Sequence, residues 1–151
     1  YTKQVPDMES PCNKVTPPLG LLYVGRNEPG EWFKITVETA AAGTYVADVL
    51  YTSNRGGKIG VEVDGTASRS TFDLESTFDP KETIPWRQWH HWNVAREAFE
   101  VTLPKGVSVL TVRILTNGNL NLATFALRPK GSPRTGPDIT AVKTSTPPAA
   151  K

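Results

Sequence analysis

Short runs of alternating apolar and polar residues, each bounded by a turn signal, recur through the middle of this chain. Alternation is the period of a β-strand, whereas an amphipathic helix repeats its apolar positions every three or four residues. No credible helix separates the runs, and their spacing of about ten residues is typical of an all-β sandwich. We therefore predict an all-β fold, an antiparallel β-sandwich, with strands at 32–37, 44–51, 58–63, 66–72, 97–103, 107–115 and 120–127.

Turn residues between the runs support this assignment. Predicted strands are separated by Gly43, by Gly56-Gly57, by Pro104–Gly106 and by Asn117-Gly118. Asp64-Gly65 is a strong signal for a two-residue hairpin, because both residue types tolerate the left-handed backbone that such a turn requires. We expect the strands on either side of it to pair.

The two ends of the chain differ from its middle in composition. Residues 130–151 are rich in proline, glycine, serine and threonine and hold almost no large apolar side chain, so we expect a linker or disordered tail. Residues 1–20 hold four prolines and little periodicity, and we expect an irregular segment with an edge strand near 5–8. The folded core is predicted at 21–129, and 151 residues suit one domain of this size.

Charge and cysteine content argue against several classes of partner. The formal net charge is +2 with acids and bases interspersed, and no basic stretch is long enough to follow a phosphate backbone, so nucleic acid is not expected. No apolar run approaches the roughly 18 residues of a membrane span. Cys12 is the only cysteine, which rules out an intrachain disulfide. We expect a soluble monomer without a membrane partner.

Three of the four tryptophans lie at a spacing of three within Ile84–Trp92. Such a stripe could face one way on a helix, but Pro85 and several weak helix formers argue against that. We expect a loop at 78–86 that leads into a strand near 89–94.

The large aromatic residues are expected to divide between core and surface. We assign Trp92 to the core and Trp86 to the exposed loop, and we leave Trp89 open. Trp32 follows a turn at the start of a strand and is assigned to the core. Tyr51 ends a strand before a glycine-rich loop, so we expect it to pack inside with a polar tip.

Six short motifs are spread along nearly the whole predicted core. They lie at Val24–Trp32, Ala42–Tyr45, Gly57–Gly65, Trp86–Trp89, Val101–Gly106 and Leu120–Leu127. Their joint order and spacing resemble the family 6 carbohydrate-binding modules and their family 35 relatives. The resemblance implies a galactose-binding-domain-like jelly roll that binds a polysaccharide or oligosaccharide without catalysis. It also implies a covalently attached glycoside hydrolase domain and a secreted, periplasmic or cell-surface location.

The resemblance further implies a set of site residues. In these modules two aromatic rings flank one sugar, and an asparagine hydrogen-bonds its hydroxyls. The asparagine corresponds to Asn121, and the loop tryptophan corresponds to Trp86 or, in a register shifted by three, to Trp89. Arg26 occupies the place of the second ring, after the Val-Gly pair. Either Tyr23 substitutes for that ring, or Arg26 contacts hydroxyls or an acidic sugar.

The resemblance allows a structural calcium ion and requires no other cofactor. Glu9 and Glu31 are the candidate calcium ligands, although the last predicted strand lacks the carboxylate that would complete the set. His90 and His91 are adjacent and would point to opposite faces of a strand, so we do not expect them to share a zinc ion.

Two other functional classes stay open. A glycoside hydrolase needs two carboxylates across a cleft. Asp73, Glu75, Asp79 and Glu82 cluster before the tryptophans, but this run is typical of a solvated loop, and no Gly-x-Ser-x-Gly motif is present. Alternatively, the chain is a scaffold or adhesion domain whose tryptophans form a protein contact.

Overall fold

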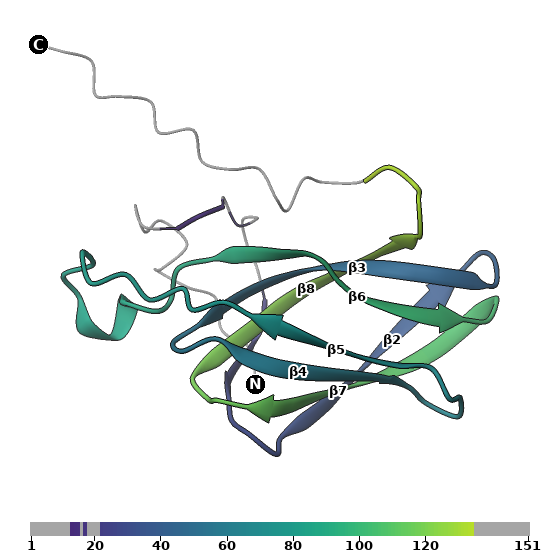
Figure 1. The fold of residues 1–151 in the computed structure, drawn as a ribbon, viewed down its shortest axis with the longest axis horizontal. Helices are drawn as coiled ribbons and strands as arrows, with labels where there is room; N and C mark the ends of the chain where they lie inside the picture. The colour runs from purple at the N-terminus through teal and green to yellow at the C-terminus, as the bar shows by residue number, and fades with distance from the viewer. Residues whose placement is uncertain (1–12, 16, 18–21, 135–151) are drawn as a thin grey trace, which may run out of the picture.

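Eight strands form two packed four-stranded sheets (Figure 1) in the computed structural model, which describes residues 13–15, 17 and 22–134. The strands are β1 (Val24–Asn27), β2 (Trp32–Thr39), β3 (Gly43–Ser53), β4 (Gly57–Val63), β5 (Arg69–Leu74), β6 (Asn93–Leu103), β7 (Gly106–Thr116) and β8 (Leu120–Pro129). One sheet has the order β1-β8-β3-β6, and the other has the order β2-β7-β4-β5. All paired strands are antiparallel, so the predicted antiparallel β-sandwich is confirmed.

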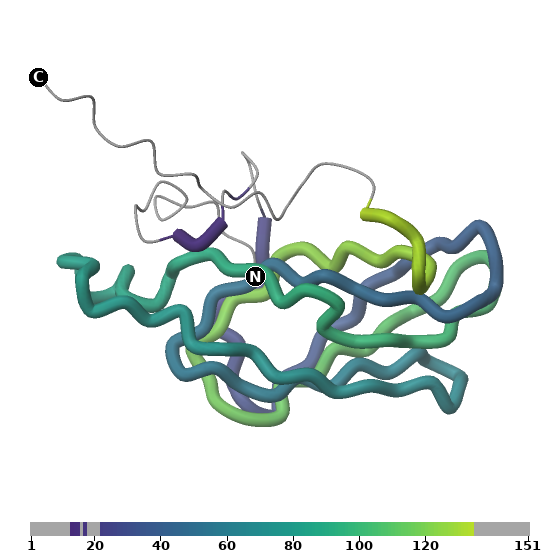
Figure 2. Tube along the Cα trace, turned by 45° about the horizontal axis from the view of Figure 1, so that its top comes forward, coloured from purple at the N-terminus to yellow at the C-terminus, as the bar shows by residue number. Residues whose placement is uncertain are grey.

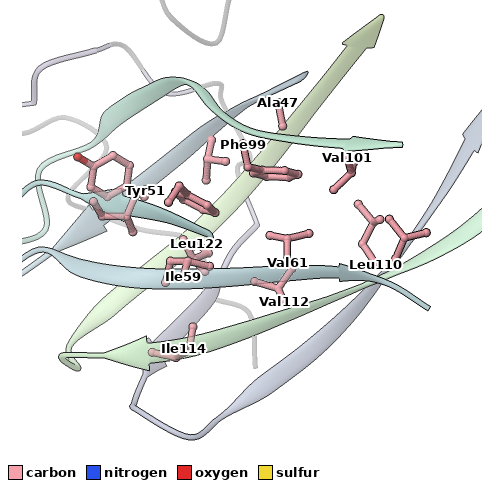
Figure 3. Packing of buried hydrophobic residues seen from close by; sticks show 14 of the residues in the cluster. Ala47, Tyr51, Ile59, Val61, Phe99, Val101, Leu110, Val112, Ile114 and Leu122 are labelled. Atoms are coloured by element: carbon pink, nitrogen blue, oxygen red, sulfur yellow. The ribbon is translucent and has the colours of Figure 1, made fainter. Parts of the chain in front are cut away.

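The alternating pattern places the core between the two sheets. On the edge strand β2, Phe33, Ile35 and Val37 pack against the core, while the residues between them are exposed. Figure 3 shows the centre of this core, where Phe99 and Leu122 of the first sheet lie over residues of β4 and β7. Burial of these apolar side chains stabilises the sandwich without disulfides.

A second, smaller cluster covers the outer face of the first sheet. It consists of Val15, Tyr23, Leu50 and Trp92. The indole of Trp92 is fully buried and meets the ring of Tyr23 edge-on at 5.2 Å, so the assignment of Trp92 to the core is confirmed. Because β3 has neighbours in its sheet on both sides and clusters on both faces, nearly all of it is buried.

Trp32 does not lie in the core, and that prediction is wrong. The side chain is 57% exposed at the first residue of β2, where the strand's alternation turns Phe33 inward and Trp32 outward. Tyr51 is buried, as predicted, and its hydroxyl accepts a hydrogen bond from Asn93 Nδ2 at 3.4 Å. Burial raises the pKa of the Tyr51 phenol above its usual value.

Three local predictions fail. β1 was not predicted from the sequence. Its four residues include Gly25, and the structure shows that Arg26 has a left-handed backbone, so the strand is short and irregular. The Asp64-Gly65 pair does not form a two-residue hairpin: β4 ends at Val63, β5 begins at Arg69, and the Val63 N–H donates to Ser68 O across a longer loop.

The third failure concerns the connection between β5 and β6. The middle of the connection at 75–92 projects beyond the end of the sandwich (Figure 2), whereas its last two residues, His91 and Trp92, are fully buried, and β6 begins only at Asn93. The strand expected near 89–94 is therefore wrong for 89–92. A single 3₁₀ turn, Pro85–Arg87, interrupts this loop.

β8 ends at Pro129, and the next residues return to the sandwich. The Lys130 N–H donates to Thr44 O, and Arg134 forms an ion pair with Asp48 on β3. The edge strand expected near 5–8 and the tail at 135–151 lie outside the described residues. Within the part that the structure describes, no helix is long and apolar enough to cross a membrane.

Candidate functional site

A hollow of about 420 Å³ opens at the end of the sandwich from which the β5–β6 loop projects. Its lining comes from three parts of the chain: the start of β1, the β5–β6 loop, and the β7–β8 turn with the start of β8. The lining residues are Tyr23, Gly25, Arg26, Trp86, Trp89, His90, Asn119 and Asn121. All five ligand-binding residues expected from the sequence therefore meet at one place.

The β5–β6 loop supplies the aromatic wall of the hollow. Pro85 opens the 3₁₀ turn, and the Gln88 N–H donates to Pro85 O at 3.3 Å, which holds Trp86 at the apex. Trp86 is 50% exposed, as predicted for a loop residue. Trp89, left open by the sequence, is half-buried and lines the same hollow.

His90 joins the two indoles into one aromatic cluster. Its ring centroid lies 3.8 Å from that of Trp89 and 5.6 Å from that of Trp86, and it meets each ring edge-on. Edge-to-face contacts of this kind fix the relative orientation of aromatic rings. The wall of the hollow is therefore a connected set of rings rather than a lone tryptophan.

Asn121 forms the floor of the hollow and is only 2% exposed. Its Oδ1 accepts the Arg26 N–H at 3.0 Å, and its Nδ2 donates to Thr52 Oγ1 at 2.9 Å. A carboxamide has two N–H donors and two acceptor lone pairs, so these bonds use one of each. The remaining donor and acceptor suit a hydroxyl, which is itself both.

Arg26 and Tyr23 flank Asn121 in different ways. Arg26 is exposed, has a φ of 57°, and sits where the β1–β8 register shifts, so the bulge turns this residue out of the ladder. Tyr23 is buried, and its ring packs under Gly25: a Cβ added at Gly25 would lie 2.8 Å from Tyr23 Cε2. Tyr23 therefore forms a wall of the hollow and is not a freely exposed second ring.

Sequence reasoning missed His90 and Asn119 as lining residues. His90 was considered only as a metal ligand on a strand, whereas it lies in the loop. Asn119 follows the Asn117-Gly118 turn and has a φ of 55°; its N–H donates to Glu28 Oε1 at 3.1 Å. The only sequence signal for Asn119 was its position two residues before Asn121, because residues two apart along a strand lie on the same side.

The charges at the hollow have a single sign. Arg26 is permanently cationic, while none of the described residues that line the hollow carries a carboxylate. The hollow can therefore stack apolar faces, hydrogen-bond hydroxyls and attract an anion. The lining that the structure describes holds no pair of carboxylates for acid–base hydrolysis.

The described residues do not form a metal site. Among them, no three His, Cys, Asp or Glu side chains lie together. The Glu31 carboxylate accepts the Glu28 N–H at 2.8 Å, and Glu9 lies outside the described residues. Glu31 alone does not fit a calcium ion, whose coordination needs six to eight oxygens. The calcium ion stays a prediction.

A larger and more open groove, of about 760 Å³, runs along the β6 edge at Glu100–Pro104. None of the described residues that line it is aromatic, and most are small or weakly polar. The smaller hollow is the better candidate, because it combines depth, rings and convergent polar groups.

The sequence matches no protein-family model and gives no significant match to a curated protein. Solved structures are similar. A family 35 carbohydrate-binding module from Clostridium thermocellum is 17% identical, with a TM-score of 0.60 over 85% of this chain and 87% of that one. The chain has the β-sandwich fold of these modules.

Two further structures with this fold contain sugars. One is the family 35 module Xyl-CBM35 in complex with a disaccharide containing glucuronic acid; it is 16% identical, with a TM-score of 0.58 over 77% of this chain and 79% of that one. The other is a family 6 module from Cellvibrio mixtus lichenase 5A in complex with cellotriose; it is 20% identical, with a TM-score of 0.56 over 84% of this chain and 86% of that one. At such identities the likeness concerns the fold.

Proposed function

We propose that this chain is a non-catalytic carbohydrate-binding module and that one sugar of a polysaccharide or oligosaccharide binds in the hollow. One observation carries the proposal: the indoles of Trp86 and Trp89 and the amide of Asn121 line the same opening. A pyranose has an apolar face of C–H groups and a rim of hydroxyls, so it needs a flat ring beside a group that both donates and accepts.

The affinity should be modest. Stacking that buries roughly 50 Å² of apolar surface contributes on the order of 1 kcal/mol, at about 25 cal/mol per Å². Each hydrogen bond to a hydroxyl that was already solvated adds about 0.5–1.5 kcal/mol. We therefore expect a Kd in the micromolar to millimolar range, roughly −4 to −8 kcal/mol. Nanomolar binding to a simple oligosaccharide would contradict this account.

The proposed function also implies a partner domain and a location for the module. We infer a glycoside hydrolase as the attached catalytic domain, and a location outside the cytoplasm where polysaccharides are found. A similar structure comes from a lichenase, which supports this inference. Tethering would raise the local concentration of substrate around the enzyme. Binding itself needs no second copy of the chain, and we expect a monomer.

Replacing the exposed indole tests the proposal. In Trp86→Ala we expect Kd to rise at least about fivefold, because a stacking surface worth on the order of 1 kcal/mol is lost together with the contact to His90. Affinity electrophoresis across glucans, xylans, mannans, galactans and uronic-acid polymers should show retardation of the wild type and loss of it in the variant.

Phe78→Ala is the matched control. Phe78 is 46% exposed in the same loop but does not line the hollow, so its loss should leave retardation unchanged. No retardation of the wild type on any polymer would favour a scaffold or adhesion domain. Turnover of a glycan by the isolated chain would instead make it an enzyme.

An acidic sugar is the ligand that Arg26 favours. Arg26 and His90 both line the hollow, and a module of the same fold is known in complex with a disaccharide that contains glucuronic acid. A guanidinium pairs with a carboxylate through two parallel hydrogen bonds. Glucuronic acid should therefore bind more tightly than glucose, and Arg26→Ala should remove the difference while weakening glucose binding little.

Isothermal titration in low and high salt measures both effects. The preference for glucuronic acid should shrink as salt rises, because screening weakens an exposed ion pair. Equal affinities of the wild type for the two sugars would contradict this assignment of the ligand and would leave the module itself intact.

A further inference from the structure

A buried carboxylate lies behind the aromatic wall of the hollow. Glu82 belongs to the acidic run that the sequence assigned to a solvated loop, and for this residue that assignment is wrong: Glu82 is only 7% exposed. Burying an ionised carboxylate is costly unless it is paired and hydrogen-bonded. Glu82 should therefore have a specific role in the loop.

The side chain of Glu82 gathers three groups from the end of the loop. Its Oε1 accepts the Ile84 N–H at 3.1 Å. Its Oε2 lies 3.5 Å from Arg87 Nη2 and 3.8 Å from His91 Nε2. The backbone adds two bonds, since the Glu82 N–H donates to Asp79 O and Gln88 Nε2 donates to Glu82 O.

These contacts enclose the 3₁₀ turn that carries Trp86. Ile84 immediately precedes the turn, Arg87 ends it, and Gln88 follows it. Glu82 therefore contacts the chain on both sides of the exposed indole: its carboxylate accepts the Ile84 N–H before Trp86 and lies beside the Arg87 guanidinium after it. Trp86 is 50% exposed, so its orientation depends on the turn and on its edge-on contact with His90.

His91 connects this turn to the sandwich. Its ring is fully buried, and its Nδ1 lies 3.0 Å from Thr77 O. The Thr77 hydroxyl donates to Trp89 O at 2.6 Å and accepts the Ser53 N–H at 2.9 Å, at the end of β3. A continuous set of contacts thus runs from β3 through Thr77, His91 and Glu82 to the turn beneath Trp86.

We propose that Glu82 is a positioning residue of the sugar site: it fixes the 3₁₀ turn so that Trp86, Trp89 and His90 present one preformed wall. This role rests on the proposed function, although Glu82 does not line the hollow and touches no sugar itself. Loss of the charge leaves the largely buried guanidinium of Arg87 without its anion, and removing one member of a buried ion pair is strongly destabilising. The turn then loosens while the two sheets stay packed.

Glu82→Gln tests this role because it keeps the size of the side chain and an oxygen for the Ile84 N–H. We expect the Kd for glucuronic acid or cellotriose, whichever the wild type binds more tightly, to rise at least about tenfold. In protein labelled with 5-fluorotryptophan, the Trp86 fluorine resonance should shift or broaden without any sugar present. The amide resonances of β3, β4, β7 and β8 should stay in place.

Glu75→Gln is the matched control, since Glu75 is an exposed acid of the same run and makes the same change in charge. It should change neither the Kd nor the fluorine spectrum. A Kd within twofold of wild type for Glu82→Gln, or an equal loss in Glu75→Gln, would overturn the proposal. If Glu82→Gln does not fold, Arg87→Lys keeps the charge but not the planar fork, and the same two measurements apply.

The sugar-free spectrum separates this inference from the proposed function. If the wild type binds neither sugar, the proposed function fails, and an altered Trp86 resonance in Glu82→Gln still supports the positioning role. An unaltered Trp86 resonance in a folded Glu82→Gln protein overturns the positioning role whatever the sugar affinity.

Discussion

At the scale of single residues, Asn121 serves both the fold and the site. Its buried amide joins β1 to β3 by bonding the Arg26 N–H and Thr52 Oγ1, and it still faces the hollow. Holding the amide by two internal bonds fixes its orientation before any sugar arrives. Such preorganisation lowers the entropy that binding costs.

Asn121→Ala should therefore impair stability and binding together. The Arg26 N–H and the Thr52 hydroxyl lose their partner, and each unsatisfied buried group costs about 1–3 kcal/mol. We expect a lower free energy of unfolding in urea and no measurable binding of the best sugar by titration calorimetry.

Thr52→Val is the control that separates these two effects. It removes only the hydroxyl that Asn121 Nδ2 meets, so stability should fall, while the Kd should rise far less than in Asn121→Ala because the amide itself and its bond to the Arg26 N–H remain. If Asn121→Ala has the same free energy of unfolding as the wild type, the hydrogen bonds from Asn121 to Arg26 and Thr52 do not stabilise the fold.

The aromatic residues show what sequence can predict at this scale. Trp86 was placed correctly, because Pro85 before it favours a loop. Trp92 was also placed correctly, although the strand expected near 89–94 begins only at Asn93. Trp32 was misplaced, since alternation gives the two faces of a strand but does not say which one meets the other sheet. Glu82 was misplaced because its partners, Arg87 and His91, follow it along an irregular loop that has no period.

At the scale of elements, alternation predicted seven strands and missed the shortest. Five of the seven begin and end within two residues of their expected bounds, whereas β6 starts four residues early and β5 starts three residues late. The β5–β6 loop was harder, because tertiary hydrogen bonds from Thr77 and Glu82, rather than local propensity, decide its path. The candidate site depends on that loop and on the bulge of β1.

Gly25 on β1 should prove essential for the hollow. A Cβ at this position would lie 2.8 Å from Tyr23 Cε2 and 3.1 Å from Asn121 Oδ1, so both side chains must move. We expect Gly25→Ala to cost about 1–3 kcal/mol of stability, as overpacking does, and to weaken sugar binding. Thermal unfolding and titration calorimetry measure the two effects.

Gly60→Ala provides the comparison on another strand. Its Cβ would meet only Leu115, on the outer face of the second sheet and no closer than 3.4 Å, so we expect near-normal stability and Kd. Equal behaviour of the two alanine variants would argue against a close-packed Tyr23–Gly25–Asn121 contact.

At the scale of the whole molecule, one buried acid ties the last described residues to the first sheet. Asp48 on β3 accepts the Glu97 N–H at 2.7 Å and pairs with Arg134. Burial alone would raise the pKa of Asp48, but the hydrogen bonds from Arg134 and from the Glu97 N–H outweigh it and hold the pKa below its usual value.

This lowered pKa predicts how stability depends on pH. The stabilisation is fully present above the unfolded pKa of about 3.9 and is lost as pH falls through the lower folded pKa. Arg134→Ala should reduce the free energy of unfolding at pH 7 by less than about 1 kcal/mol, because Arg134 is partly exposed. Urea unfolding at several pH values should show this difference vanish once Asp48 is protonated.

Lys130→Ala is the comparison for this network. Lys130 and Glu100 form an ion pair whose side chains are 59% and 48% exposed, so its loss should be hard to detect at any pH. A difference between wild type and Arg134→Ala that persists unchanged into strong acid would refute the assigned role of Asp48.

The architecture of the whole molecule was the most predictable level. Alternation and turn residues recur along the chain, so many weak local signals agree on a sandwich. The position of the hollow was predictable only through the resemblance, because it assembles residues from 23 to 121 that no local pattern connects.

Because Arg134 pairs with Asp48 on β3, a domain fused after residue 134 would start from a defined place on the first sheet. Asp48 lies four residues along β3 from Thr52, which supports Asn121 under the hollow, and four strand residues span roughly 13 Å. Asp48 and Thr52 also point to the same side of the sheet. A reporter or enzyme attached at residue 134 would therefore begin close to the hollow, on the order of 13 Å along β3 from the residue that supports Asn121.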